Sequence, residues 1–412
     1  MNQPRAVVIG GGIGGLTAAV ALRQRGWAVT VLERASALTP VGAAIGLMPN
    51  AQRALDVIGL GGRVRELSAW QGAGGLRTPG GRWLNRMDGQ AAADRFGGPL
   101  VLLHRATLIG ILRDALPDDA VRTGVAATLG DPGGDRRTAV VDTTEGALEA
   151  ELVVAADGIH SAARRVLFPG HPGPAYAGYT TWRVVVPPPG RPFAPHETWG
   201  RGRLWGTQPL KDGRVYAYAM AVRPAGAHAP DDERAELRRL FGDWHDPVPR
   251  VIKAATAEGV LRHDVHEMRV PLPAYHRGRV ALIGDAAHAM QPTLAQGGNQ
   301  AIEDAVVLAH HAGPGAAPGP GADAGAGAGT VPGLAAYTAD RLPRTTAIVR
   351  QARRTGRLAA ADGAVTVALR DHLVAGVSRL VPGLVLRNFD GIADWRPPRR
   401  TYASGTPRGQ RG

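Results

Sequence analysis

The feature that most constrains this chain is its N-terminal stretch, residues 5–34, in which a glycine cluster separates two apolar runs. The first run, Ala6–Ile9, is long enough for one buried strand, and the second, Ala28–Leu32, for another. Between them, Leu16–Arg25 carries apolar residues at helical spacing, and Gly26 stands where a helix-terminating glycine belongs. This order of strand, glycines, helix and strand predicts the first βαβ unit of a parallel sheet.

Three of these glycines have the G-x-G-x-x-G spacing that binds the pyrophosphate of a dinucleotide. Gly10 permits the tight turn, Gly12 lets the backbone approach the phosphates, and Gly15 allows close packing of helix and strand. The acid Glu33, followed by Arg34, comes roughly 20 residues later and can accept hydrogen bonds from an adenosine ribose. An acid there favours FAD or NAD over NADP. For the glycines alone the alternative is an ordinary turn, but the complete order favours dinucleotide binding.

Two later strands also end in an acid beside a glycine. The buried run Leu152–Ala156 leads into Asp157-Gly158 and a short helix that carries Arg164. The run Val280–Ile283 ends in Gly284-Asp285. Ligands of open α/β sheets bind at the carboxyl ends of the strands, so both pairs are candidate cofactor contacts. A plain helix N-cap is the alternative for Asp157.

The segment after Asp285 predicts an anion-binding helix start. A loop leads into a helix that continues to Leu308, and its candidate cofactor contacts are Pro292, Gln296, Gly297, Gly298 and Asn299. Backbone N–H groups at this helix start could hold negative charge on a reduced flavin ring. His288 is better interpreted as a structural loop histidine than as a catalytic base. Arg105, at another strand-to-helix junction, could reach a phosphate or ribityl group.

Residues 176–268 alternate between strand-like runs and turns, which predicts an antiparallel sheet inserted into the α/β domain. The clearest runs are Thr180–Pro187, Arg203–Thr207 and Arg214–Val222. Tyr216 and Tyr218 share one face of the last run and could form the floor of an aromatic pocket, although such residues equally well pack against a helix. Arg183 and Arg203 are candidate anchors for an anionic substrate, with a solvated charge as the alternative for each.

Composition limits the remaining possibilities. The 412 residues suffice for two domains with a helical appendage. The chain contains no cysteine, which excludes disulfides, thiolate metal sites and a cysteine-anchored flavin, and we expect no metal. The net charge of +13 comes almost entirely from arginine, a bias typical of GC-rich coding, so we do not expect a nucleic-acid partner. No run of about 18 apolar residues occurs, which predicts no membrane helix and a cytoplasmic location.

Together, these motifs resemble the single-component (group A) FAD-dependent aromatic monooxygenases, which have the para-hydroxybenzoate-hydroxylase-like fold, over roughly residues 3–395. The chain is most similar to the salicylate- and urate-hydroxylase-like branch, with zeaxanthin epoxidases nearby. The resemblance matches the family's GxGxxG, ribose acid, FAD-contacting arginine, DG motif and GD motif to the residues described above. One departure is Ala295, where many relatives have glycine. The absence of a second G-x-G-x-x-G fits, because the family lacks a separate nicotinamide domain.

The resemblance implies non-covalent FAD, with NADH or NADPH as reductant and O2 as co-substrate. A flavin C4a-hydroperoxide would insert one oxygen atom into a phenolic or heteroaromatic small molecule, while the protein orients it and excludes water. An epoxidase acting on an electron-rich alkene is the alternative on the same fold. A halogenase would resemble its own family in a W-x-W-x-I-P motif and a catalytic lysine, and neither is visible. A flavin-binding protein without turnover is a third possibility. No catalytic residue is assigned, and the oligomeric state is expected to be a monomer or homodimer.

The expected domain organisation follows from the same resemblance. Residues 1–175 and 269–311 form a discontinuous Rossmann-like FAD-binding domain, and residues 176–268 form the mostly antiparallel substrate sheet inserted into it. Residues 312–333, rich in Ala, Gly and Pro, are expected to be a flexible insertion. Residues 334–395 form C-terminal helices, and residues 396–412 a disordered tail.

Overall fold

The predicted βαβ unit is present as β1 (Arg5–Ile9), α1 (Ile13–Gln24) and β2 (Ala28–Glu33). The computed structural model describes residues 3–38, 44–68, 73–313, 330–380 and 384–398. β1 and β2 lie in a six-stranded sheet of order β17-β18-β11-β1-β2-β7. Its other strands are β7 (Val121–Thr123), β11 (Leu152–Ala155), β17 (His276–Arg277) and β18 (Val280–Leu282). Only the edge strand β17 is antiparallel to its neighbour. This confirms the Rossmann-like α/β fold class.

Helix α1 packs against strands β1, β2 and β11 of this first sheet, and β1, β11 and β18 are apolar apart from Arg5. The chain continues through α2 (Pro49–Val57), α3 (Gly61–Arg65), α4 (Gly89–Phe96), α5 (Arg105–Asp114), a 3-10 turn at Asp118–Ala120 and α6 (Ala162–Leu167). A three-stranded meander of β8 (Ala127–Asp131), β9 (Ala139–Thr143) and β10 (Gly146–Ala150) lies beside it. Strands β3 (Ala44–Leu47) and β6 (Val101–His104) pair with each other as an antiparallel two-stranded ribbon.

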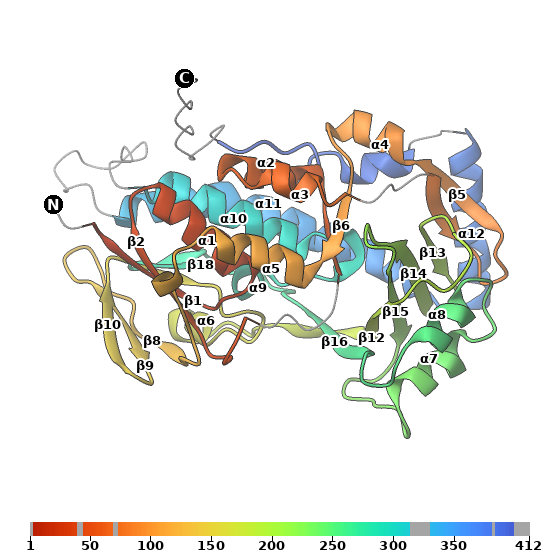
Figure 1. Cartoon of the computed structure of the whole chain (residues 1–412), viewed down its shortest axis with the longest axis horizontal. Coiled ribbons are helices and arrows are strands. Elements are labelled where there is room, and N and C mark those ends of the chain that lie inside the picture. Colours follow the sequence, from red (N-terminus) through yellow and green to blue (C-terminus); the bar gives the residue numbers. More distant parts are fainter. Residues whose placement is uncertain (1–2, 39–43, 69–72, 314–329, 381–383, 399–412) are drawn as a thin grey trace, which may run out of the picture.

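A seven-stranded sheet forms the second layer, in the order β16-β12-β15-β14-β13-β4-β5, at the opposite end of the molecule from the meander (Figure 1). Its strands from the predicted insertion are β12 (Ala175–Val186), β13 (His196–Trp199), β14 (Arg203–Pro209), β15 (Val215–Val222) and β16 (Leu261–Glu267). Helices α7 (Glu233–Phe241) and α8 (Val248–Ala254), which we did not predict, pack on one face.

The expected domain boundary needs a correction, because two strands of this second sheet come from the N-terminal third of the chain. β4 (Ala73–Arg77) and β5 (Trp83–Asp88) form a hairpin, and β4 pairs with β13 in parallel. Residues 73–88 therefore belong to the second, seven-stranded sheet. Apolar runs alone could not show this, because they do not reveal which sheet edge a hairpin joins.

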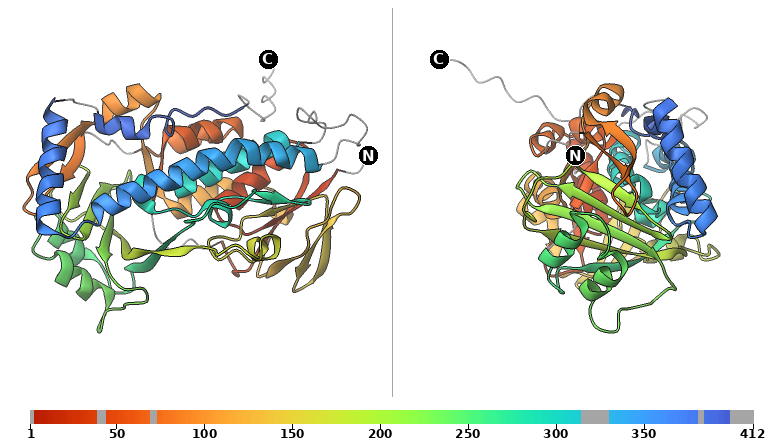
Figure 2. Two further views of the ribbon diagram at one scale, coloured as in Figure 1. Left: turned by 180° about the vertical axis from the view of Figure 1, so that it is seen from behind. Right: turned by 90° about the vertical axis from the view of Figure 1, so that its right-hand side faces the viewer.

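Two long helices connect the layers. α9 (Asp285–His288), a 3-10 turn (Pro292–Leu294) and α10 (Gly297–His311) follow β18, and α11 (Thr330–Ala359) packs along α10. Figure 2 shows α11 running from the first sheet to the second, where α12 (Ala364–Leu380) covers the far end and a 3-10 turn (Leu384–Phe389) follows. The predicted C-terminal helices are thus present. In the described part of the chain no helix is sufficiently long and apolar to cross a membrane.

The Ala/Gly/Pro insertion is shorter than we predicted. α11 already begins at Thr330, and Gly333 lies against the carbonyl of His311, so closely that a Cβ there would be 2.3 Å from the oxygen. Residues 314–329, at the centre of the expected insertion, and 399–412, in the expected tail, lie outside the described residues.

A buried histidine at the junction of β13 with the hairpin makes stability depend on pH. His196 is 2% exposed, donates through Nδ1 to the carbonyl of Ala194, and packs against Trp83 and His245. Burial lowers the pKa of His196 to about 4, with Arg77 contributing in the same direction. Between pH about 4 and 6.5, therefore, His196 is mostly neutral in the folded state but protonated in the unfolded state.

The stabilisation from neutral His196 should be complete above pH about 6.5 and disappear as the pH falls towards 4. The shift corresponds to about 3 kcal/mol of unfolding free energy. Urea unfolding of wild type and His196→Phe across this range measures it: the difference between the two proteins should change with pH. The exposed His372→Gln serves as the control. A constant difference for His196→Phe would contradict the assignment.

Candidate active site

Four parallel strands end at one edge of the first sheet, and the predicted site residues follow directly after them. Gly10 follows β1, Glu33 ends β2, Asp157 follows β11 and Asp285 follows β18. The structure therefore gathers motifs that are up to 275 residues apart in the sequence (285 − 10). This is the edge at which open α/β sheets bind ligands.

The three motif glycines are each required for a different geometric reason. Gly10 has a φ of +109°, and a Cβ there would lie 2.4 Å from the Ala156 oxygen. At Gly15 a Cβ would be 2.0 Å from the Gly10 oxygen, so α1 can contact the strand only without a side chain. At Gly12 a Cβ would meet no protein atom within 4 Å, so the surface there is open to a ligand. The loop combines tight packing with an accessible N-terminus of α1.

Glu33 holds the glycine loop in place. Its Oε2 accepts the backbone N–H of Gly11 at 2.8 Å, and its Oε1 accepts that of Ala35 at 2.9 Å. The neighbouring Arg34 is exposed. The carboxylate therefore lies beside the loop, with further lone pairs for ribose hydroxyls.

Replacing Glu33 with alanine should weaken FAD binding by roughly 10–150-fold, because charge-assisted hydrogen bonds of about 1.5–3 kcal/mol are lost. Flavin fluorescence titration of apoprotein gives the dissociation constant. Arg34→Gln is the neighbouring comparison that keeps the carboxylate. An unchanged constant in Glu33→Ala would place the adenosine elsewhere.

Asp157 in the DG loop makes a helix-capping contact and also carries an acceptor atom that no described residue uses. Its Oδ2 accepts the backbone N–H of Ala163, so it helps cap α6, although Ser161 is the N-cap residue. Its Oδ1 is buried and has no hydrogen-bond partner among the described residues. Gly158, with a φ of +78°, has no protein atom near its Cβ position. The DG loop therefore offers an unused hydrogen-bond acceptor, Oδ1 of Asp157, and an open backbone at Gly158.

Arg164 lies on α6, the predicted short helix, with its side chain turned into the protein. It is 3% exposed, and its guanidinium donates to the carbonyls of Ile159 and Ala286 at 2.7 and 3.0 Å. Burial lowers its pKa, while Asp157 acts in the opposite direction. The side chain therefore ties the DG loop to the GD loop, and any effect on the cofactor is through these loops.

Asp285 and Arg105 lie close enough for their charges to interact. Asp285 is exposed although the residues on both sides of it are buried, and Gly284 before it has a φ of +59°. Arg105 begins α5, and burial lowers its pKa while the carboxylate of Asp285 raises it. An open carboxylate opposite a cation can bind hydroxyls on one side and a phosphate on the other.

The loop into α10 presents its backbone, while two of its predicted contacts turn inwards. Gln296 and Asn299 are fully buried: Gln296 accepts from Asn50, and Asn299 accepts the N–H of Met48 and donates to Gly46. At the helix start Gly297 and Gly298 are half-buried, and Pro292 before them is exposed. A Cβ at Gly298 would be 2.6 Å from Cδ1 of Ile45, whereas at Gly297 the nearest atom is Oδ1 of Asp285 at 3.9 Å. Ala295 takes a φ of +51°, which explains why glycine suits this position.

These features fit a flavin dinucleotide. The open glycines at Gly12 and Gly158, Oδ1 of Asp157, which has no partner among the described residues, and the exposed Asp285 lie along the carboxyl edge of the first sheet, after β1, β11 and β18. The uncapped N-terminus of α10 ends it. The open backbone at Gly12 would suit the pyrophosphate, the carboxylates of Asp157 and Asp285 would suit ribityl hydroxyls, and the N-terminus of α10 would suit the electron-rich ring.

One face of the second sheet carries three of the four predicted substrate residues. Tyr216 and Tyr218 lie next to each other on β15 with ring centroids 5.6 Å apart, and Arg183 pairs with Tyr218 in the β12–β15 register. Leu102 of β6 packs against Tyr216. On the same face Tyr179 donates to Gln291 at 3.0 Å, beside Pro292. This face of the sheet is therefore turned towards the loop of residues 292–298 that leads into α10, which we call the flavin loop.

Arg203 does not share this face, so our prediction for it is corrected. Its guanidinium donates to the carbonyl of Leu240 and lies over the ring of Trp244, on the side covered by α7 and α8. The cause is the two-residue period of a strand, which places Arg203 with Trp205 and opposite Leu204. We remove it from the candidate pocket.

Two residues of this face escaped sequence analysis. Glu197 on β13 accepts the hydroxyl of Tyr218 at 2.5 Å, and His263 on β16 contacts Arg183 at 3.1 Å. Burial lowers the pKa of His263, and the charge of Arg183 lowers it further. Neither residue lies in a motif. Only the alternation along β13, once its register was known, could have identified Glu197.

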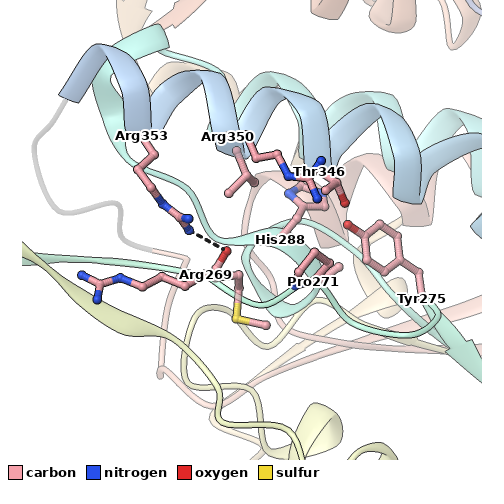
Figure 3. A pocket seen from close by; sticks show the side chains of 10 residues that line it. Arg269, Pro271, Tyr275, His288, Thr346, Arg350 and Arg353 are labelled. Atoms are coloured by element: carbon pink, nitrogen blue, oxygen red, sulfur yellow. Dashed lines mark hydrogen bonds between the residues drawn. The ribbon is translucent and has the colours of Figure 1, made fainter. Parts of the chain in front are cut away.

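His288 lies behind the flavin loop, in a pocket between α11 and the segment Met268–Tyr275 (Figure 3). It is 2% exposed and its Nε2 is 2.6 Å from Oδ2 of Asp304, which also accepts the N–H of Gly284. The pocket also contains Arg350 and Arg353 of α11. These contacts support the structural interpretation of His288, because it anchors the GD turn to α10.

The comparisons with known proteins agree with this geometry. Residues 4–352 match the family model described as FAD binding domain. The chain is 35% identical over 376 residues to aurachin C monooxygenase/isomerase of Stigmatella aurantiaca, covering 90% of this chain and 94% of the relative. It is 37% identical over 370 residues to 3-amino-4-hydroxybenzoate 2-monooxygenase of Streptomyces cremeus, covering 85% and 86%.

A solved structure gives the same result. Klebsiella pneumoniae HpxO complexed with FAD and uric acid superposes with a TM-score of 0.82 at 28% identity, covering 94% of this chain and 97% of that one. The chain belongs to the FAD-binding-domain family. It is a FAD-dependent monooxygenase of the aromatic-hydroxylase type, in which NAD(P)H is the reductant and O2 the co-substrate.

Proposed function

We propose that this enzyme hydroxylates a small aromatic compound bound between the flavin loop and the tyrosine-bearing face of the second sheet. The observation that supports the proposal is the convergence of Tyr216, Tyr218 and Arg183 on the face that Tyr179 joins to Gln291. Aromatic surface suits a ring, and an arginine suits a carboxylate or phenolate. Arg183 also favours an anionic ring over a neutral alkene, the alternative substrate class.

Three tasks fall to the protein's own residues. Tyr216, which is 9% exposed, and Leu102 would stack against the ring and exclude water. Arg183, whose Nε is buried without a partner among the described residues, would orient the anionic group. Bound FAD supplies the redox chemistry: electrons from NAD(P)H reduce O2, one oxygen atom enters the ring and the other leaves as water.

Position is the critical variable for such a transfer, because reacting atoms must be within about 3–3.5 Å. Tyr216→Phe and Arg183→Ala should therefore keep FAD affinity while lowering hydroxylated product per NAD(P)H oxidised. The difference should appear as hydrogen peroxide. A panel of phenols, aromatic acids and heteroaromatics, scored for NAD(P)H consumption and peroxide, provides the substrate for this test.

Unchanged coupling and unchanged KM in both variants would remove these residues from the substrate site. Loss of FAD would show that the sheet supports the cofactor instead. Burial raises the pKa of Tyr216 to about 12, so the phenol should remain neutral and its contribution should not vary between pH 6 and 9.

The remaining proposals concern the substrate class, the cellular location, the oligomeric state and the choice of reductant. We propose a small-molecule aromatic substrate, a cytoplasmic location and a monomer or homodimer in solution. Light scattering after size-exclusion chromatography measures the oligomeric state directly. NADH and NADPH are distinguished by comparing kcat/KM for each reductant with the same aromatic substrate.

A further inference from the structure

Helix α12 carries a row of exposed apolar side chains on its outer face. The row consists of large apolar residues three or four positions apart, a spacing that places them on one side of a helix. These residues, which we call the α12 stripe, are Val365, Leu369, Leu373, Val377 and Leu380. The first and the last of them are 82% and 84% exposed. Half of the ten large apolar residues that are exposed in the described part of the chain thus lie on this one helix.

The opposite face of α12 is packed against the protein. Arg370 and Ala375 are buried, and the guanidinium of Arg370 lies 5.4 Å from the ring centre of Trp199 on β13. Asn85 of β5 donates to the hydroxyl of Ser378 at 3.0 Å. Figure 2 shows α12 at the outer end of the molecule, so the stripe faces away from the second sheet. A helix that is apolar on both faces is normally covered on both, and a continuous apolar row marks an interaction surface.

The charges nearest the stripe are positive. Arg379 lies beside it on α12, and Arg357 lies in the last turn of α11. Arg201 donates to the carbonyl of Asp362 just before α12. All three arginines are exposed, and among the described residues none of them forms an ion pair. Residues 359–380 contain two acids, the exposed Asp362 at the start of the helix and Asp371, which is already ion-paired.

Size and charge distinguish between the surfaces that could cover the stripe. A stable protein interface takes about 800 Å² and 20–30 residues from each partner, far more than one row on one helix offers. A second copy would also bring unpaired arginines of one chain towards those of the other, and each chain carries a net charge of +13. A lipid bilayer accepts an apolar helix face of this width, and its anionic headgroups attract the arginines beside that face.

We propose that the α12 stripe docks the enzyme on the surface of an anionic lipid bilayer. The apolar side chains enter the boundary between headgroups and acyl chains, while Arg379, Arg201 and Arg357 contact the headgroups. The helix lies in the plane of the surface and does not cross the bilayer, because it has 17 residues, fewer than the ~20 that a span requires, and its inner face holds the buried Arg370. This inference goes beyond the proposed function and does not depend on the identity of the substrate.

Vesicle co-sedimentation of the FAD-loaded enzyme tests the proposal. The probes are vesicles of equimolar phosphatidylglycerol and phosphatidylcholine, compared with vesicles of phosphatidylcholine alone. Wild type should bind the anionic vesicles preferentially, and the binding should weaken as the salt concentration rises. Leu369→Gln/Leu373→Gln should bind them at least about 10-fold more weakly, because two side chains no longer enter the apolar boundary. Arg379→Gln should reduce both the binding and its dependence on salt.

Two further pairs of substitutions separate the stripe from general effects of surface polarity. Val365→Gln/Leu380→Gln, at the two ends of the stripe, should weaken vesicle binding as the central pair does. Val166→Gln/Val270→Gln removes side chains outside α12 that are 46% and 48% exposed, and this variant should keep wild-type binding. Flavin content and the circular dichroism spectrum verify that each variant is folded. The rate of NAD(P)H oxidation without vesicles should be the same in the stripe variants as in wild type.

Several outcomes would overturn the proposal. Wild type that binds neither kind of vesicle, or binds both equally well, would contradict docking on anionic lipid, and so would full vesicle binding by both stripe variants. Light scattering would assign the stripe to a second copy if it showed a dimer that Leu369→Gln/Leu373→Gln converts to a monomer, with no vesicle binding by wild type. In each case the hydroxylase proposal stands, because it depends on the first sheet and on the tyrosine-bearing face of the second.

Discussion

Replacing Arg341 with methionine should lower the free energy of unfolding by about 3–5 kcal/mol. Arg341 on α11 is 1% exposed and bridges two carboxylates of α10 that are wholly buried, Glu303 at 2.5 Å and Asp304 at 2.7 Å. Burial alone would raise the pKa of Asp304, but His288 and Arg341 outweigh it and lower this pKa to about 2. Without the guanidinium, two buried negative charges lose their main counter-charge.

Urea unfolding monitored by circular dichroism measures this loss, and Arg350→Met provides the matched control. Arg350 lies on the same helix but is exposed, so its replacement should change stability by no more than about 0.5 kcal/mol. The Arg341 variant should also release flavin more readily, because Asp304 holds the N–H of Gly284. A variant within 1 kcal/mol of wild type would show that Arg344, which also contacts Glu303, compensates.

Gly15→Ala and Gly12→Ala should separate the folding role of the glycine loop from its binding role. A methyl group at Gly15 would meet the Gly10 oxygen at 2.0 Å and Cγ1 of Val8 at 3.2 Å, both in the core. We expect a loss of about 1–3 kcal/mol in stability together with flavin. At Gly12 a methyl group meets no protein atom within 4 Å, so stability should be retained while FAD affinity falls at least about 10-fold, a change of about 1.4 kcal/mol.

Thermal melting of the apoproteins and flavin titration distinguish the two effects. Gly110→Ala is the control: this glycine lies within α5 with no protein atom near its Cβ position, and alanine there should be neutral or stabilising. Full flavin affinity in Gly12→Ala would mean that the pyrophosphate does not approach the backbone at this glycine.

Sequence predicted the first sheet well because its information is local. In the stretch Arg5–Glu33 the apolar runs, the glycines and the terminal acid are each dictated by one strand or one turn. The strand ends at Asp157 and Asp285 were found for the same reason. Their meeting at one edge followed from the parallel topology, which such runs imply.

Side-chain direction within the site was less predictable. Gln296, Asn299 and Arg164 have the residue types of cofactor ligands, yet buried contacts from distant segments use their polar groups. The strand that starts at Arg203 was predicted, but which face of it turns towards the other substrate candidates was not fixed by the sequence, so Arg203 was included among them. Glu197 required the register of β13 against β14, a contact between strands that no local pattern encodes.

The central claim is that this enzyme transfers one atom of O2 to an aromatic ring. Turnover under ¹⁸O-labelled O2, with the FAD-loaded enzyme, NAD(P)H and the best aromatic substrate of the panel, tests it most directly. We expect a product carrying one labelled oxygen per molecule, formed in step with NAD(P)H oxidation, and a shift from product to hydrogen peroxide in Arg183→Ala. Product without label, or NAD(P)H oxidation that yields only hydrogen peroxide with every aromatic compound tested, would contradict it.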